Sequence, residues 1–368
     1  MTMLPPLPLP DGVLARIVEG VNGLDMHVLE AGDPSCPAIL LLHGFPELAY
    51  SWRKIMLPLA NLGFHVIAPD QRGYGRTTGW SDDYDGDLFT FRMPNLVRDA
   101  IGLLARLGHG HVAHLIGHDF GASVAGWAGL LRPDIFRTVT VMSAPFASPV
   151  PLPIGAPEPV SGNIDTELAA LGRPRKHYQR YYSTRPANAE MMAAPAGLRD
   201  FIHAYFHMKS AAWPENCPFE LSGWTGEALA AMPTYYIMDQ ATTMPEAVAA
   251  AMPVSPNAWF SDADIDIYTA EYARTGFQGG LNWYRCRFVL EYLAELSLFG
   301  GAKMQCPLAF ISGAQDWGIR QTPGALQAME TRASIAYRGT TLIDDAGHWV
   351  QQEQPEAVVE AFKAAMLN

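Results

Sequence analysis

The sequence lacks the features that mark nucleic-acid-binding and membrane-spanning chains. It has no long run of Lys or Arg, and its formal net charge is −12 with an isoelectric point near 5.3. We therefore expect neither nucleic acid nor a membrane as a partner. No apolar stretch reaches the roughly 18 residues that a membrane helix needs. The Pro-rich residues 1–10 have no charged segment before an apolar core, so we expect no secretory signal and an extended path along the surface.

Cysteine is also scarce, and none of it is paired by spacing. Free, mostly buried thiols in the reducing cytoplasm are the expected state of these four residues: Cys36, Cys217, Cys286 and Cys306. The histidines His109, His111 and His114 lie close together, but no Cys or carboxylate completes a metal-binding set. We therefore expect neither a metal nor a cofactor.

What the sequence does contain is an alternation of apolar strands and amphipathic helices. A hairpin is predicted over residues 13–19 and 24–30, with its turn at Asn22-Gly23. Further strands are predicted over residues 38–42, 64–70, 112–116, 138–142, 308–313 and 340–343. Helices are predicted over residues 51–62, 95–107, 122–131 and 355–366. Because the later strands are apolar throughout, we predict an α/β fold with a mostly parallel sheet flanked by helices.

The alternation stops between the strand at 138–142 and the strand at 308–313. Residues 146–300 are rich in Pro, Tyr, Trp, Met and Ala, with helical periodicity and no clear strand. We interpret them as a helical cap (lid) inserted into the α/β core. The expected domains are therefore residues 1–145 and 301–368 for the core and residues 146–300 for the cap.

The segment Gly117-His118-Asp119-Phe120-Gly121 has the spacing of a nucleophile elbow, Gly-x-nucleophile-x-Gly, between a predicted strand and a predicted helix. The middle residue is Asp119 rather than Ser or Cys. A carboxylate that attacks an alkyl carbon leaves an ester that water can cleave at the carboxylate's own carbonyl carbon. Asp119 therefore indicates an sp³ carbon electrophile with a built-in leaving group, such as an epoxide or a carbon–halogen bond. An Asp that only caps the following helix is the alternative.

Three other positions complete a catalytic arrangement. After the strand at 38–42, Gly44 permits a turn that leaves the Phe45 N–H free to stabilise a developing oxyanion. Asp316 follows the strand at 308–313, and His348 follows the strand at 340–343. The chain order Asp119, Asp316, His348 is that of nucleophile, acid and base in a triad.

At these residues the sequence resembles the α/β-hydrolase superfamily, and within it the soluble epoxide hydrolases, from residue 13 to the C-terminus. The motif at residues 43–46, the Asp elbow at 117–121 and two cap segments, 176–182 and 280–285, carry the resemblance. It implies that Tyr178 and Tyr284 donate to the epoxide oxygen, although Tyr181 or Tyr182 could take the place of Tyr178.

The resemblance implies an epoxide hydrolase that makes a vicinal diol. Asp119 would form an alkyl ester, and His348, oriented by Asp316, would activate the water that cleaves it. The Phe45 and Phe120 N–H groups would form the oxyanion hole. We expect a substrate pocket lined by Trp317, Trp349 and Tyr182.

The alternatives are a haloalkane or haloacid dehalogenase on the same fold and a non-catalytic ligand-binding homologue. Phe120 offers no side-chain donor for a halide, where the family pattern implies Trp or Arg. Aromatic residues of the cap indicate a hydrophobic or aryl epoxide as substrate: Tyr181, Tyr182, Trp213, Trp224 and Trp259. The expected partners are this small molecule and water, with the chain a monomer or homodimer.

Overall fold

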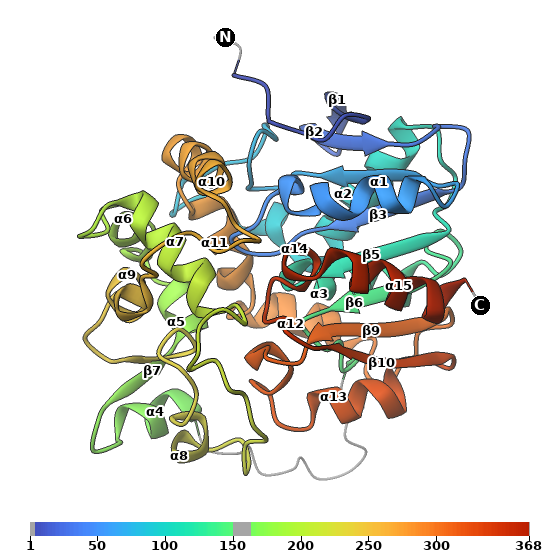
Figure 1. The fold of residues 1–368 in the computed structure, drawn as a ribbon. Coiled ribbons are helices and arrows are strands. Elements are labelled where there is room, and N and C mark those ends of the chain that lie inside the picture. Colours follow the sequence, from blue (N-terminus) through green and yellow to red (C-terminus); the bar gives the residue numbers. More distant parts are fainter. Residues whose placement is uncertain (1–3, 150–162, 368) are drawn as a thin grey trace.

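An eight-stranded, mostly parallel sheet forms the centre of the fold (Figure 1). This computed structural model describes residues 4–149 and 163–367. The strands of this sheet are β1 (Val13–Val21), β2 (Leu24–Ala31), β3 (Ala38–Leu42), β4 (His65–Pro69), β5 (His114–His118), β6 (Val139–Met142), β9 (Leu308–Gly313) and β10 (Tyr337–Ile343). Their order is β1-β2-β4-β3-β5-β6-β9-β10. The β1–β2 and β2–β4 pairs are antiparallel, and every other pair is parallel.

The predicted fold class is confirmed, and the hairpin turns at Asn22-Gly23 as expected. One strand is displaced from its prediction. Strand β5 covers His114–His118 instead of residues 112–116, because Val112 forms only an isolated bridge with Phe136. The strand therefore runs to the residue directly before Asp119.

Helices cover both faces of the sheet. One face carries α1 (Arg53–Ala60), α14 (Val350–Glu353) and α15 (Pro355–Met366), and the other carries α2 (Met93–Arg106) and α3 (Phe120–Leu131). Each layer buries its own apolar cluster against the sheet, which explains why the central strands β3 to β6 are buried along their whole length. Short segments complete the core: η1 (Ala49–Trp52), η2 (Phe89–Phe91), η4 (Trp317–Ile319), α13 (Ala325–Ala328) and η5 (Met329–Ala333).

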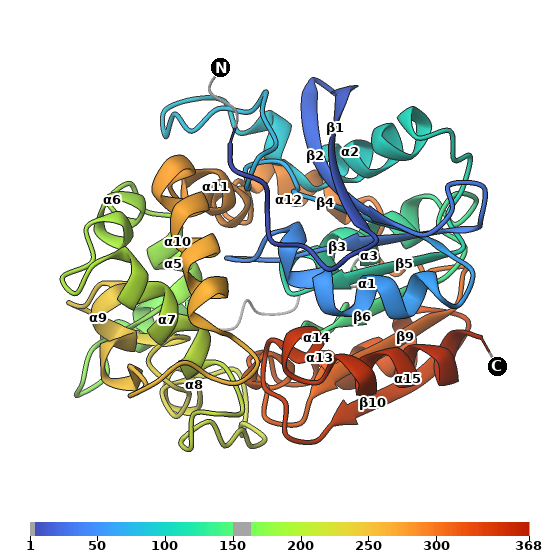
Figure 2. The same cartoon turned by 45° about the horizontal axis from the view of Figure 1, so that its top comes forward.

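A second, mostly helical layer lies beyond the carboxyl ends of the parallel strands (Figures 1 and 2). It contains α4 (Ile164–Ala169), α5 (Tyr178–Tyr182), α6 (Ala187–Met192), α7 (Leu198–Met208), α8 (Gly226–Leu229), α9 (Met244–Val248), η3 (Ala249–Ala251), α10 (Asp262–Thr275) and α11 (Gln278–Cys286). The expectation of no strand in this region is wrong. The strands β7 (Arg175–His177) and β8 (Ile237–Asp239) pair there as a small antiparallel sheet, too short to give a visible alternation in the sequence.

The last helix before β9, α12 (Leu290–Ser297), brings the chain back to the core. Phe299, just after it, packs on Trp127 of α3 with ring centroids 5.9 Å apart. Residues 150–162, which the expected cap includes, lie outside the described residues, as do residues 1–3 of the N-terminal segment.

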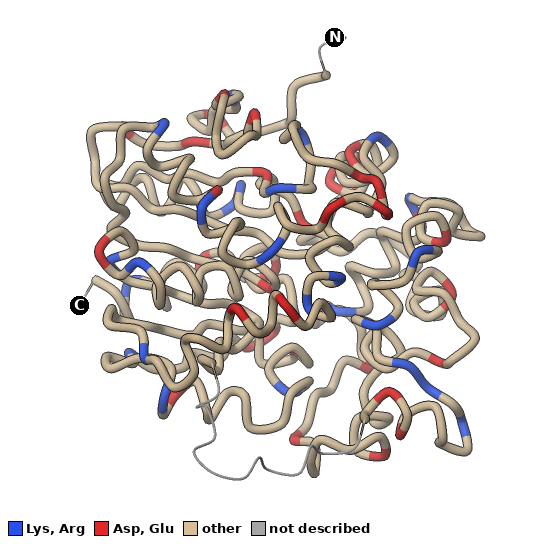
Figure 3. The backbone as a smooth tube through the Cα atoms, turned by 180° about the vertical axis from the view of Figure 1, so that it is seen from behind, with Lys and Arg blue, Asp and Glu red and all other residues tan. Residues whose placement is uncertain are grey.

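Within residues 4–149 and 163–367, no helix is both long enough and apolar enough to cross a bilayer. All four cysteines are free, but only Cys286 and Cys306 are buried, while Cys217 is exposed. At the N-terminus, the partly buried Leu7 and Leu9 pack against the core. Acidic and basic positions are interspersed over the fold (Figure 3).

Candidate active site

Asp119 lies on a tight turn between β5 and α3. Its backbone has φ 53° and ψ −119°, a conformation that is strained for any residue other than Gly. The two flanking glycines make this turn possible. A Cβ at Gly117 would lie 2.2 Å from the Gly121 carbonyl oxygen, and a Cβ at Gly121 would lie 2.2 Å from that of Leu42. The turn predicted from the spacing is therefore present, and Asp119 stands at its apex.

The loop after β3 holds one oxygen of this carboxylate. The Phe45 N–H donates to Asp119 Oδ1 over 2.9 Å. Gly44 lies so close that a Cβ on it would be 2.4 Å from Asp119 Oδ1. Phe120 is the first residue of α3, so its N–H is one of the helix donors that have no acceptor within the helix. Both expected oxyanion-hole residues are thus adjacent to Asp119.

His348 contacts both carboxylates of the predicted triad. Its Nδ1 lies 3.1 Å from each oxygen of Asp316, and its Nε2 lies 3.2 Å from Asp119 Oδ2. The second contact has poor angular geometry, and Nε2 forms no hydrogen bond within the described residues. Asp316 also accepts the Gly318 N–H over 2.6 Å. The geometry leaves Nε2 facing the Asp119 carboxylate with its own hydrogen-bonding capacity unused.

Burial and charge shift the pKa values of these groups in opposite senses. Burial alone would raise the pKa of Asp119, but His348 outweighs it and keeps that pKa well below its usual range. The pKa of Asp316 is lowered in the same way. Burial and Lys209 lower the pKa of His348, whereas Asp316 and Asp119 raise it further, so that the net shift is upward. In the unreacted protein this arrangement favours two carboxylates and a charged imidazole.

Sequence reasoning missed a buried polar network behind His348. Glu47 Oε2 pairs with His118 Nδ1 over 2.5 Å, and His118 Nε2 lies 2.6 Å from the His348 carbonyl oxygen. Gln351 and Gln352 donate to the other oxygen of Glu47, each over 2.9 Å. A clue was available, since a His at the end of an apolar strand must find a hydrogen-bond partner when buried.

Glu353 of α14 fixes the same loop from the other side. It accepts the N–H groups of Gly347 and Trp349, which flank His348, over 3.0 Å each. It also accepts the N–H of Ala211 over 2.8 Å. Burial raises the pKa of Glu353 to about 7. One side chain thus ties the His348 loop to the segment that follows α7.

A cavity of about 140 Å³ lies beside Asp119. Its lining residues include Asp119, Phe120, Ser123, Tyr178, Gln179, Tyr284, Arg287, Gln321 and Thr322. The two expected tyrosines therefore line the cavity that the nucleophile lines. Their ring centroids are 6.0 Å apart. Burial raises the pKa of both phenols, which favours the protonated, hydrogen-bond-donating form.

The hydroxyl contacts distinguish Tyr178 from its neighbours. Tyr178 donates to Gln321 Oε1 over 3.3 Å and accepts from Gln179 Nε2 over 3.1 Å. Tyr182 instead donates to Tyr205 over 3.1 Å, away from the lining of this cavity. Tyr181 lines a separate surface pocket. The geometry favours Tyr178 over these two alternatives.

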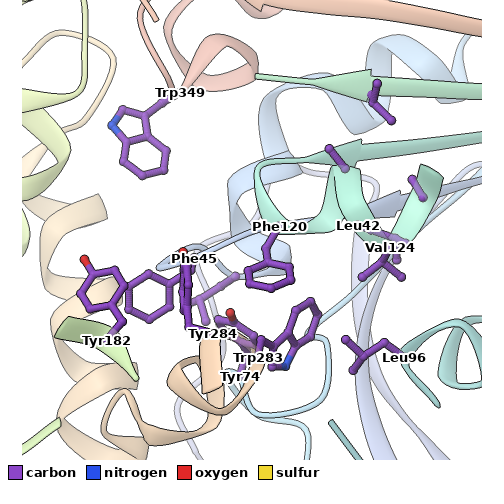
Figure 4. Close-up of a cluster of buried hydrophobic side chains, with 14 of the residues drawn as sticks. Leu42, Phe45, Tyr74, Leu96, Phe120, Val124, Tyr182, Trp283, Tyr284 and Trp349 are labelled. Atoms are coloured by element: carbon purple, nitrogen blue, oxygen red, sulfur yellow. The ribbon is translucent and has the colours of Figure 1, made fainter. Parts of the chain in front are cut away.

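The residues expected to form a substrate pocket are placed differently. Trp317 is buried against Phe219 at 5.0 Å, and the Trp349 indole donates to the Phe206 carbonyl over 2.8 Å. Neither lines the cavity beside Asp119, and Tyr182 does not line it either. Figure 4 shows the rings of Phe45, Tyr284 and Phe120 close together, Tyr182 beside Phe45, and Trp349 apart from them. The cap aromatics from which we predict an apolar substrate pocket do not line this cavity: Tyr181, Tyr182, Trp213, Trp224 and Trp259.

Comparison with known proteins agrees with the fold. Residues 37–192 match the family described as alpha/beta hydrolase fold. The chain is 33% identical to epoxide hydrolase A of Mycobacterium tuberculosis, over 94% of this chain and 95% of that protein. It is also 33% identical to an epoxide hydrolase of Caballeronia sordidicola, over 92% and 89% of the two chains.

Solved structures give the same picture. An epoxide hydrolase from an endophytic Streptomyces superimposes with a TM-score of 0.76 at 27% identity, covering 96% of this chain and 95% of its own. Epoxide hydrolase A from Mycobacterium thermoresistibile has a TM-score of 0.72 at 32% identity, with 95% and 97% covered. The elbow, the fold and these full-length similarities agree: the chain belongs to the epoxide hydrolase family of the α/β-hydrolase superfamily.

Proposed function

We propose that this protein converts an epoxide and water into a vicinal diol through an ester on Asp119. One observation carries the proposal: a carboxylate stands at the elbow, with one oxygen held by the Phe45 N–H and the other facing His348 Nε2. A hydroxyl at this position could not release an alkyl product, whereas an aspartyl ester can be hydrolysed.

In the first step, Asp119 Oδ2 attacks one carbon of the epoxide ring. The ring C–O bond breaks, and its electron pair goes to the epoxide oxygen. That oxygen takes a proton from Tyr178 or Tyr284, whose hydroxyls are kept protonated by burial. The product of this step is a hydroxyalkyl ester on Asp119 and one tyrosinate. The charged His348 then gives a proton to this tyrosinate through solvent, which leaves a neutral tyrosine and a neutral imidazole.

In the second step, neutral His348 takes a proton from water as the water oxygen attacks the Asp119 carbonyl carbon. The negative charge develops on Oδ1, where the Phe45 N–H already donates and where the Phe120 N–H, at the start of α3, is available. Collapse of the tetrahedral intermediate breaks the ester bond, and the leaving alkoxide takes a proton from the imidazolium to become the diol. The Asp119 carboxylic acid then gives its proton to His348, which restores the carboxylate and the charged imidazole of the unreacted protein.

We further propose that residues 146–300 act as a cap over this chemistry, with residues 1–145 and 301–368 as the core. The position of α4 to α11 beyond the carboxyl ends of the strands supports this division. Tyr178 and Tyr284 then come from the cap, and the triad comes from the core. A cytoplasmic location and a monomeric or dimeric state remain predictions.

The substrate class is a separate proposal. Aromatic rings and polar side chains, among them Gln179, Gln321 and Thr322, line the cavity together. We propose a hydrophobic epoxide such as styrene oxide as the first substrate to assay.

The decisive experiment follows diol formation from styrene oxide by the purified protein and by the Asp119→Ala variant. The wild type should form diol, and the variant should not. The His348→Gln variant, incubated with the epoxide, should accumulate an adduct that peptide mass spectrometry places on Asp119. Diol formation by Asp119→Ala at the wild-type rate would refute the scheme. Halide release from a haloalkane with no diol formation would favour the dehalogenase alternative.

A further inference from the structure

Lys209 is a buried cation that the mechanism above does not use. It follows α7, and only 4% of its surface is exposed. Its ammonium lies over four aromatic rings, 5.1 Å from Trp349, 5.4 Å from Tyr205 and Tyr236 and 5.9 Å from Tyr235. Within residues 4–149 and 163–367, no carboxylate oxygen lies within 4.0 Å of it. Such burial is costly for a charge, so this position calls for a physical explanation.

This aromatic cage adjoins the active-site base. The Lys209 carbonyl oxygen accepts the His348 N–H over 2.8 Å. Trp349 forms one wall of the cage and directly follows His348 in the chain. Its ring centroid is 4.7 Å from that of His348. The ammonium and the imidazole therefore both pack against the indole of Trp349. Any charge on Lys209 acts on His348 through an environment that contains little water.

The charges around His348 are otherwise mostly negative. Asp119 faces it from the elbow, Asp316 from the loop after β9, and Glu47 from the loop after β3 through His118. The phenols of Tyr205, Tyr235 and Tyr236 are neutral, because burial raises their pKa values. Glu353 also lies against this loop, where it accepts the N–H groups of Gly347 and Trp349. Asp119 and Asp316 favour a charged imidazole, yet a base must give up its proton before it can accept one.

We propose that Lys209 is an electrostatic positioning residue, a fixed cation that offsets the field of the carboxylates at His348 and so keeps this imidazole available as a base. The inference rests on the proposed function for its catalytic meaning. The aromatic cage explains how the positive charge of Lys209 can be buried and still act on His348. A carboxylate partner would cancel the positive field, whereas aromatic rings stabilise the ammonium through their quadrupoles and leave its charge intact.

The pKa directions agree with this arrangement. After burial, Lys209 is the next largest influence that lowers the pKa of His348. Its charge also helps to lower the pKa values of Asp119 and Asp316. Burial lowers the pKa of Lys209 itself, while these carboxylates and Glu47 act in the opposite sense.

The test compares variants that remove the charge with one that retains it. Lys209→Met and Lys209→Gln are neutral, and Lys209→Arg keeps a cation. Lys363→Met makes the same chemical change on the exposed side of α15 and serves as the control. The pKa of His348 is measured by NMR titration of histidine-labelled protein, with His348→Gln identifying the resonance. Both neutral variants should raise this pKa by about one pH unit, and Lys209→Arg and Lys363→Met should leave it in place.

Kinetics supplies a second readout. Single-turnover hydrolysis of the ester on Asp119 should be about tenfold slower in the neutral variants below the pKa of His348, and the difference should vanish at high pH. Because Lys209 does not line the cavity beside Asp119, KM should change less than kcat. Slowing to the same extent at every pH would indicate a merely structural role and overturn the proposal.

The NMR titration needs no substrate, so the two proposals can fail separately. An unchanged pKa of His348 in Lys209→Met would overturn the role of Lys209, even in an active enzyme. A raised pKa in a protein that hydrolyses no epoxide would support that role and refute the proposed activity. If the neutral variants do not fold, titration of Lys209 in lysine-labelled wild type decides the matter. Loss of its proton below pH 7 would overturn the proposal, and retention of the proton would support it.

Discussion

Among single residues, Tyr178 and Tyr284 differ from Tyr182 in a way that kinetics can detect. The first two line the cavity beside Asp119, whereas the Tyr182 hydroxyl donates to Tyr205. We expect Tyr284→Phe and Tyr178→Phe each to slow ester formation on Asp119 by on the order of 10²-fold, because each removes a donor to the epoxide oxygen. Stopped-flow fluorescence under single-turnover conditions measures this step. Tyr182→Phe is the matched control and should remain within about threefold of wild type. A larger effect in Tyr182→Phe than in Tyr178→Phe would reverse the assignment.

The base should change its proton affinity during the reaction. In the unreacted protein, burial and Lys209 lower the pKa of His348, but Asp316 and Asp119 raise it above its ordinary value. Once Asp119 is an uncharged ester, one of these two anions is gone and the pKa of His348 falls. Neutral His348 is the reactive form, so ester hydrolysis should accelerate as pH rises through this lower value. We expect the midpoint in single-turnover hydrolysis to lie at a lower pH than the NMR midpoint of the substrate-free protein. A higher midpoint during hydrolysis would contradict this reasoning.

Residues with a reactive group at the end of a strand could be predicted from the sequence, whereas residues whose place depends on contacts between distant segments could not. Asp119, Asp316 and His348 are predicted as a triad because each follows a predicted strand and carries a reactive group, and the structure brings their side chains together. The role of Glu47 has no local sign in the sequence, because its donor Gln351 lies 304 residues away. The cavity lining was also beyond the sequence. Trp317 and Trp349 neighbour the acid and the base along the chain, but their rings turn toward Phe219 and Phe206.

At the scale of elements, close packing at the elbow requires a glycine at a position where helix propensity alone would favour alanine. Gly121 lies in the first turn of α3, where Ala would normally favour a helix by about 1 kcal/mol. A Cβ there would lie 2.2 Å from the Leu42 carbonyl oxygen and 2.5 Å from that of His43, and backbone atoms cannot move aside easily. We therefore expect Gly121→Ala to destabilise the protein by about 1–3 kcal/mol in urea unfolding and to reduce activity. Gly110→Ala is the control, because nothing lies within 4 Å of its added Cβ. Equal stability of both variants would show that the elbow tolerates a wider turn.

Elements with strong periodicity were predicted close to their observed bounds, and the weak ones were not. The helix at 355–366 and the strand at 308–313 match α15 and β9 residue for residue. Helix α3 begins two residues earlier than predicted, since the turn at Asp119 feeds directly into it. The pairing of β7 with β8 was missed because three-residue strands are set by contacts between distant segments and not by local pattern.

For the whole molecule, a buried ion pair joins the core to the helical layer beyond the carboxyl ends of the strands. Arg53 of α1 donates to Asp264 of α10 over 2.7 Å, and Tyr50 donates to the same oxygen over 3.0 Å. Removal of one partner leaves a buried charge unpaired, so Asp264→Ala should cost about 3–5 kcal/mol in the free energy of unfolding. Asp266→Ala on the same helix breaks an exposed pair with Arg199 and should cost less than about 1 kcal/mol. Urea titration of both variants measures the difference. Similar losses in the two would show that burial of the Arg53 pair adds nothing.

The order of strands has a consequence for how this architecture can change. The chain leaves the sheet after β6 and returns at β9, and these two strands are direct neighbours. The two ends of the inserted helices are therefore anchored side by side, on a sheet whose hydrogen bonds do not depend on what lies between them. Such an insertion behaves as an exchangeable module. The inserted helices can therefore be exchanged, in evolution or by design, while Asp119, Asp316 and His348 keep their places in the loops that follow β5, β9 and β10.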